Sequence, residues 1–169
     1  GNLISHCHDD TLDGFSKLKL ASVEMDNALL SRVVDNMPGI VDLAIFQNTI
    51  SDLNCLGKLA SLEALQVLHS QRLGQSFNSD TLKSLRLVNP KTSTDQIIGN
   101  LPNVEHLDVT YSEGRYQMDN VPEDLFDGIA KLPNLTSLRL MRPSQIMANH
   151  QIFHFRKKDI SANDIEKVA

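Results

Sequence analysis

The stretch that most suggests chemistry is SHCHDD at residues 5–10, which contains His6, Cys7, His8 and two aspartates. Imidazole, thiolate and carboxylate groups are the usual protein ligands of transition metals. His6 and His8 would share one face of a strand but would lie about 200° apart around a helix. The second cysteine, Cys55, is distant, and no second Cys or His cluster has ligand spacing. We interpret the stretch as part of a polar terminal cap, with a metal site as an open alternative.

Signatures of catalysis and of nucleotide binding are missing from the sequence. It contains no GxSxG, no GxGxxG and no GxxxxGK[ST]. An acidic cluster of Glu123, Asp124 and Asp127 falls at the start of a predicted helix, where negative charge is favourable to the helix dipole. We therefore predict that the protein is not an enzyme and uses no cofactor.

The composition is that of an ordinary globular chain, with 169 residues, 41% hydrophobic and 22% charged. This length suits one domain, and we treat residues 1–169 as one. The net charge of −5 gives no general support for nucleic-acid binding, and no apolar run approaches the roughly 20 residues that span a bilayer. Two distant cysteines form no disulfide framework. We predict an intracellular, cytoplasmic protein whose partners are neither nucleic acid nor membrane.

One short apolar pattern recurs along the chain. Six segments read apolar-x-x-apolar-x-apolar, and they begin at Phe15, Ile40, Leu62, Leu82, Val104 and Leu135. Similar leads, MPGI, LPNV and LPNL, introduce three of them. The spacing of three and then two is not a helix period and not a strand period. A short strand in the middle of each copy would, however, turn its fourth and sixth residues toward one side.

This pattern resembles the leucine-rich-repeat superfamily over residues 15–141, and IVDLAIFQNTISDL at 40–53 matches LxxLxLxxNxLxxL best. The resemblance implies an α/β solenoid, a right-handed horseshoe or arc with a parallel sheet on its concave face and helices or turns on its convex face. The family's asparagine at the ninth position occurs here only as Asn48. The other copies carry Val23, Ser70, Pro90, Ser112 and Pro143 there. We therefore expect a short, irregular arc whose loops satisfy their backbone amides differently.

The segments between copies carry helix signals. DNALLSRVVDNMP has Asp26 or Asn27 as cap, and TSTDQIIGNLP and NVPEDLFDGIAKLP begin with cap residues at Thr92 and Asn120. The residues expected to face inward are Leu29, Leu30, Val33, Val34, Met37, Ile97, Ile98, Leu101, Leu125, Ile129 and Leu132. We expect 1–14 to form an N-terminal cap and 143–169 a C-terminal cap. In the latter, HFRKKD would be a solvated loop and ISANDIEKVA a short final helix.

The concave sheet face would carry the third, fifth, seventh and eighth positions of each copy. The seventh position is apolar in most copies, so Phe46, Leu68 and Val88 would form one column on neighbouring strands, or else fold over the strand ends. Charged residues on this face are mostly basic, which favours a partner with an acidic or mixed apolar surface. The predicted contact residues are Phe46, Leu68, Arg86, Tyr111, Arg139, Lys17, Lys19, His106 and Met141.

The function implied by the resemblance is recognition of another protein, because leucine-rich repeats mostly serve as binding modules. We expect a protein–protein interaction module of a larger protein. Two alternatives remain open. The repeats could be a structural segment that packs against other domains of the parent chain. They could also be the recognition domain of a ubiquitin-ligase receptor, an immune receptor or a bacterial effector.

Overall fold

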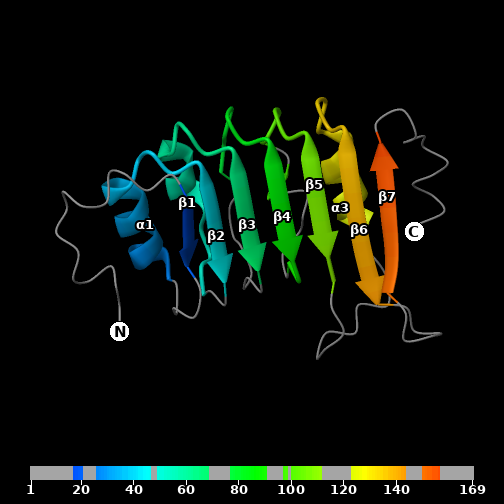
Figure 1. Ribbon diagram of the computed structural model, residues 1–169, viewed down its shortest axis with the longest axis horizontal. Helices are drawn as coiled ribbons and strands as arrows, with labels where there is room; N and C mark the ends of the chain where they lie inside the picture. The colour runs from blue at the N-terminus through cyan, green and yellow to red at the C-terminus, as the bar shows by residue number, and fades with distance from the viewer. Residues whose placement is uncertain are drawn as a thin grey trace.

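The computed structural model describes residues 17–20, 26–46, 49–68, 77–90, 97–98, 100–111, 123–143 and 150–156. Within these ranges the chain forms a seven-stranded sheet whose strands lie side by side in sequence order, from β1 to β7 (Figure 1). The first six strands pair in parallel, and the last pairs antiparallel to its neighbour. The expected α/β fold with a parallel sheet is therefore confirmed.

The first six strands coincide with the centres of the repeated segments. They are β1 (Lys17–Leu20), β2 (Asp42–Phe46), β3 (Ala64–Leu68), β4 (Ser84–Val88), β5 (His106–Thr110) and β6 (Ser137–Pro143). The last strand, β7 (His150–Arg156), lies outside the repeated segments. Equivalent positions of successive copies pair with each other, as Leu43 with Leu65 and Leu65 with Leu85. The register is thus the one that the sequence pattern specifies.

One backbone arrangement recurs where β3, β4, β5 and β6 begin. The carbonyl of Val41 accepts from the amides of Glu63 and Ala64 at 2.9 and 3.0 Å. The carbonyls of Glu63, Lys83 and Glu105 accept in the same way from the two equivalent amides of the following copy. Because the chain repeats this contact from strand to strand, each copy is aligned by the one before it.

The segments that return from one strand to the next vary in form. They include α1 (Asn27–Asn36), the 3₁₀ helix η3 (Asn54–Lys58) and α3 (Glu123–Ala130). The Asp26 side chain accepts a hydrogen bond from the Leu29 amide at 2.7 Å and caps α1. Of the two predicted cap residues, Asp26 and Asn27, the cap is therefore Asp26. Asn27 links α1 to the next return segment, since its side chain bonds the amide and hydroxyl of Ser51.

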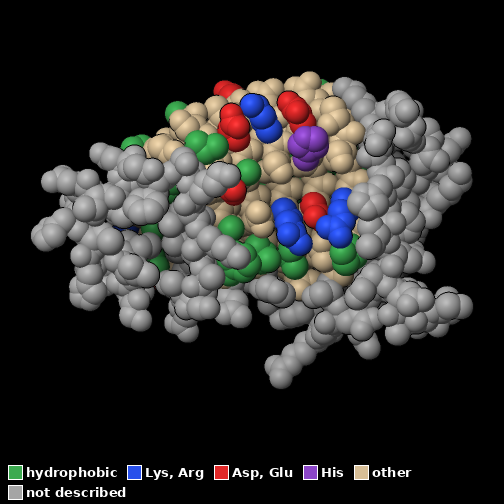
Figure 2. Space-filling view, viewed as in Figure 1, with side chains coloured by type: hydrophobic (Ala, Val, Ile, Leu, Met, Phe, Trp, Pro, Cys, Tyr) green, Lys and Arg blue, Asp and Glu red, His purple; other side chains and the backbone are tan. Residues whose placement is uncertain are grey.

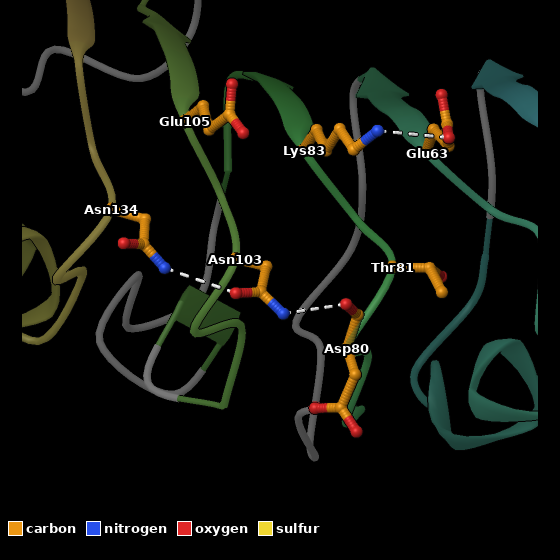
Figure 3. Close-up of a pocket in the computed structure, with 7 residues that line it drawn as sticks. All are labelled: Glu63, Asp80, Thr81, Lys83, Asn103, Glu105 and Asn134. Carbon is orange, nitrogen blue, oxygen red and sulfur yellow. Dashed lines mark hydrogen bonds and ion pairs between the residues drawn. The ribbon is translucent and has the colours of Figure 1, made fainter.

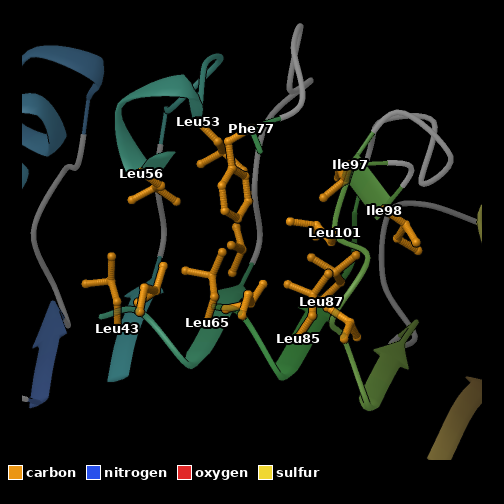
Figure 4. Packing of buried hydrophobic residues seen from close by; sticks show 14 of the residues in the cluster. Leu43, Leu53, Leu56, Leu65, Phe77, Leu85, Leu87, Ile97, Ile98 and Leu101 are labelled. Atoms are coloured by element: carbon orange, nitrogen blue, oxygen red, sulfur yellow. The ribbon is translucent and has the colours of Figure 1, made fainter. Parts of the chain in front are cut away.

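The hydrophobic core lies between one face of the sheet and these return segments (Figure 4). The fourth and sixth residues of copies two to six are almost fully buried there. All the predicted inward residues of the return segments are buried as well, except Leu29, which is partly buried against the core. The leucines of neighbouring copies therefore share one core.

Copy four is built differently from its neighbours just before its strand. In four other copies the first apolar residue donates its amide to a carbonyl three residues earlier, as Leu62 does to Leu59 at 3.2 Å. In copy four the Leu82 amide instead donates to the hydroxyl of Ser79 at 3.2 Å. Phe77, two residues further back, is 1% exposed and fills core space between the strands and the returns (Figure 4).

One expectation needs correction, and several others fall outside the described residues. The prediction that HFRKKD is a loop is wrong for His154–Arg156, because these residues complete β7. Their backbone pairs with β6, as Arg156 with Ser137 and His154 with Arg139, which a search for parallel repeats cannot anticipate. The N-terminal cap with SHCHDD, the final helix, Asn48 and the caps at Thr92 and Asn120 lie outside the described residues.

Candidate functional site

The sheet has a second face, opposite the core, which we call the outer face. Alternating side chains along each strand and the aligned register place equivalent positions of successive copies in rows across it. The small row is Asp42, Ala64, Ser84, His106 and Ser137. The charged row is Ala44, Gln66, Arg86, Asp108 and Arg139. The apolar row is Phe46, Leu68, Val88, Thr110 and Met141.

The apolar row runs along the ends of the strands. Phe46, Leu68 and Met141 are half-buried, whereas Val88 and Thr110 are buried. Neighbouring strands are about 4.8 Å apart, so these side chains form one continuous line. They lie on the opposite side of the sheet from the buried leucines, and the repeat pattern does not require them to be apolar.

Charged side chains meet in the next row. Asp108 Oδ2 accepts a hydrogen bond from Arg139 Nη1 at 2.9 Å and lies 3.6 Å from Arg86 Nε. The other carboxylate oxygen, Oδ1, accepts from the Thr110 hydroxyl at 3.2 Å. One aspartate from β5 therefore joins arginines from the strands on either side. Figure 2 shows the corresponding pattern of two basic side chains flanking an acidic one, with hydrophobic side chains beside them.

A groove of about 340 Å³ lies over β3 to β6 on this face. Its polar lining comes from Gln66, Ser84, Arg86, His106, Asp108, Ser137 and Arg139. The hollow follows from the sequence, because small side chains at Ala64, Ser84 and Ser137 lie next to the long side chains of the charged row. We call it the arginine groove.

A second depression, of about 380 Å³, lies where the strands begin and is lined by polar residues. Figure 3 shows Asn134, Asn103 and Asp80 in one line, joined by the hydrogen bonds of the two asparagines. Asn103 Nδ2 donates to the Asp80 carbonyl at 2.7 Å, and the Thr81 hydroxyl donates to the Leu62 carbonyl at 2.8 Å. These residues immediately precede their copies and bond the previous one, so their role is to support the fold.

Most predicted contact residues for which the structure gives a side chain lie together on the outer face. Phe46, Leu68 and Met141 share the apolar row, Arg86 and Arg139 share the charged row, and His106 is exposed in the small row. Tyr111 does not join them, because it is 8% exposed and belongs to the core cluster. We therefore leave Tyr111 out of the proposed surface. Lys17 and Lys19 lie in β1, where only the backbone is described.

The sequence places Asp108, Ser84, Ser137 and Gln66 on this face, but they are not among the predicted contact residues. The sequence does contain a signal for the role of Asp108. Arg86, Asp108 and Arg139 occupy the same position in three successive copies. Equivalent positions of neighbouring copies are adjacent in a parallel sheet, so alternating charge there predicts cross-strand ion pairs.

Other kinds of site find no support within the described ranges. No group of three or more His, Cys, Asp or Glu side chains in them could hold a metal ion. None of their helices combines the length and apolar character needed to cross a bilayer. Cys55 is a half-buried free thiol, and burial raises its pKa above the ordinary value.

No protein-family model matches the chain, and no curated protein is significantly similar to it.

Proposed function

We propose that this chain is a leucine-rich-repeat solenoid that binds a partner protein through the outer face of its sheet. The repeat assignment is supported by three recurring features. The strands follow one another in chain order, equivalent leucines pair in register, and the same backbone contact recurs at the start of successive strands.

The observation that carries the binding proposal is the apolar row. A sheet face that only met water would favour polar side chains at these positions, yet Phe46, Leu68, Val88 and Met141 align on it. A row of mostly apolar side chains with charged groups beside it is typical of an interface, where an apolar centre is surrounded by polar contacts.

The charges next to the row define the partner's chemistry. Arg86 and Arg139 share the one carboxylate of Asp108, so the described part of the charged row carries a net positive charge. The occupant we propose is a partner-protein segment with apolar side chains for the apolar row and an acidic group for the arginines. No catalytic step and no cofactor are part of this proposal.

The experiment is a pull-down from an extract of the source organism with three purified baits. They are the wild type, Leu68→Asp in the apolar row, and Ala60→Asp, which places the same charge at an exposed turn away from this face. Circular dichroism verifies that all three are folded. A captured partner is then purified, and its Kd is measured for each bait.

We expect one partner to bind the wild type and the Ala60→Asp bait, and to bind Leu68→Asp about tenfold more weakly or worse. A partner held equally by all three baits would show that the outer face is not the binding surface. The proposal would also be weakened if the wild type retained no protein beyond those that Leu68→Asp retains.

A further inference from the structure

The pairing within the charged row leaves one arginine poorly matched. Arg139 makes a direct hydrogen bond to Asp108 at 2.9 Å, but Arg86 Nε lies 3.6 Å from the same oxygen, which is too far for one. Arg86 Nε is buried and makes no hydrogen bond within the described structure. Buried polar groups usually have a partner, so this atom marks an incomplete arrangement.

The rest of the Arg86 side chain is accessible from outside. Its side chain is 42% exposed, and that of Arg139 is 32% exposed, while Asp108 between them is only 22% exposed. Since Nε is buried, a ligand could reach the Arg86 guanidinium only through its Nη atoms. Two guanidinium groups therefore reach the surface with one carboxylate between them.

The arginine groove opens beside these two groups. Its volume of about 340 Å³ is roughly ten times that of one liquid water molecule, so it has room for a carboxylate or phosphate with part of its chain. Hydroxyl groups of Ser84 and Ser137 and the imidazole of His106 line it as well. Hydroxyl and guanidinium donors are the groups that recognise oxyanions, and planar guanidinium groups suit them best.

We propose that the arginine groove is an oxyanion site, which takes a carboxylate or phosphate group through the exposed edges of Arg86 and Arg139. Asp108 positions both arginines and competes with the incoming anion for them. In the partner protein of the proposed function, on which this reading of the anion's source rests, the group is an acidic or phosphorylated side chain. The anion site itself can be tested without that partner.

The test is a titration of the whole protein with glutarate and, separately, with inorganic phosphate at constant ionic strength. ¹H–¹⁵N NMR follows the arginine Nε–Hε signals, and sodium chloride is the reference titrant. Arg86→Gln and Arg139→Gln assign the two signals and remove one guanidinium each. Lys83→Gln is the matched control, because it also removes one positive charge but lies in the other depression.

We expect saturable shifts of the Arg86 and Arg139 signals with at least one of the two anions and none with chloride. Either arginine substitution should abolish saturation, whereas Lys83→Gln should preserve it. Asp108→Asn should tighten binding about threefold or more, because it removes the competing charge. The anion that binds more tightly identifies the source of the group. Tighter binding of glutarate indicates an acidic side chain, and tighter binding of phosphate indicates a phosphorylated one.

Signal shifts that are linear and equal for all salts would overturn the oxyanion site. Saturable shifts of the Arg139 signal that are unchanged in Arg86→Gln would overturn it as well. Binding that weakens in a folded Asp108→Asn would overturn the competing role of Asp108. These outcomes are independent of the pull-down. If a partner is lost from Leu68→Asp and no anion binds, the interaction surface is supported and the oxyanion site is refuted. If an anion binds and no partner is found, the oxyanion site is supported and the interaction surface is refuted.

Discussion

The side-chain amide of Asn134 donates a hydrogen bond to the side-chain oxygen of Asn103 at 3.1 Å, across one repeat. The same Asn134 nitrogen also lies 3.1 Å from the Pro102 carbonyl, and Asn103 in turn donates to the Asp80 carbonyl at 2.7 Å. These side chains, which connect neighbouring copies, stand just before the strands. The leucine-rich-repeat resemblance implies a connecting asparagine after the strand, and in this sequence only the second copy has one, Asn48.

The first prediction concerns this connection. Asn103→Ala removes the donor to the Asp80 carbonyl and the acceptor for Asn134, so we expect the free energy of unfolding to fall by about 0.5–1.5 kcal/mol. Urea denaturation followed by circular dichroism measures it. Asn78→Ala, at an exposed position one copy earlier, is the control and should change stability by less than about 0.5 kcal/mol. Equal effects of the two substitutions would show that the asparagine connection contributes nothing.

A second prediction concerns Phe77, which is buried just before copy four. Phe77→Ala should cost about 3–5 kcal/mol, because its 1% exposed ring fills core space that alanine would leave empty. Phe46→Ala removes the same ring from the half-buried apolar row and should cost clearly less. Chemical denaturation of both variants gives the comparison. A larger loss for Phe46→Ala would mean that the apolar row belongs to the stabilising core.

The sequence predicted the repeated strands well, and for a physical reason. A strand buries the apolar residues at the fourth and sixth positions of a copy on one face, and six repetitions of this spacing predict strands such as β3, with Leu65 and Val67. The predicted column of Phe46, Leu68 and Val88 follows from the same register.

What the sequence reading missed depends on contacts between copies. The bond from Arg139 to Asp108 spans 31 residues and exists only because two strands are in register. The burial of Tyr111 was missed because its position just after β5 resembles a surface position in the pattern. Strand β7 carries no repeat signal, and its pairing with β6 is determined by tertiary structure.

A third prediction concerns the start of α1. Asp26→Ala removes the side-chain acceptor for the Leu29 amide and should lower the free energy of unfolding by about 0.5–2 kcal/mol. Asp26→Ser keeps an acceptor at the same place and should retain most of that stability. Thermal denaturation distinguishes the two. If Asp26→Ser lowered the stability as much as Asp26→Ala, the loss would be due to the charge of Asp26 or to another contact, and not to capping.

A fourth prediction follows from Cys55. Burial is the main cause that raises its thiol pKa, and a hydrogen bond with Ser31 opposes the rise. The folded state therefore holds the proton more tightly than the unfolded state. The resulting stabilisation is present below the ordinary pKa of 9.0 and is lost as the pH rises through the higher folded value. Between pH 8 and pH 10, Cys55→Ala should lose less stability than the wild type in urea denaturation. Parallel curves for the two proteins would contradict the prediction.

The last prediction asks whether the ion pairs of the charged row serve the fold or the surface. Asp108 and Arg139 are 22% and 32% exposed, so solvent and salt screen their attraction. A double-mutant cycle with Asp108→Asn and Arg139→Gln should give a coupling of about 0.2–1 kcal/mol, and the coupling should shrink at high salt. Urea denaturation of the four proteins supplies the cycle.

A coupling above about 2 kcal/mol would instead make the pair a structural element, and the arginines would then be too firmly held to accept another anion. A weak coupling is what a binding surface requires, because each guanidinium must exchange Asp108 for a ligand at little cost.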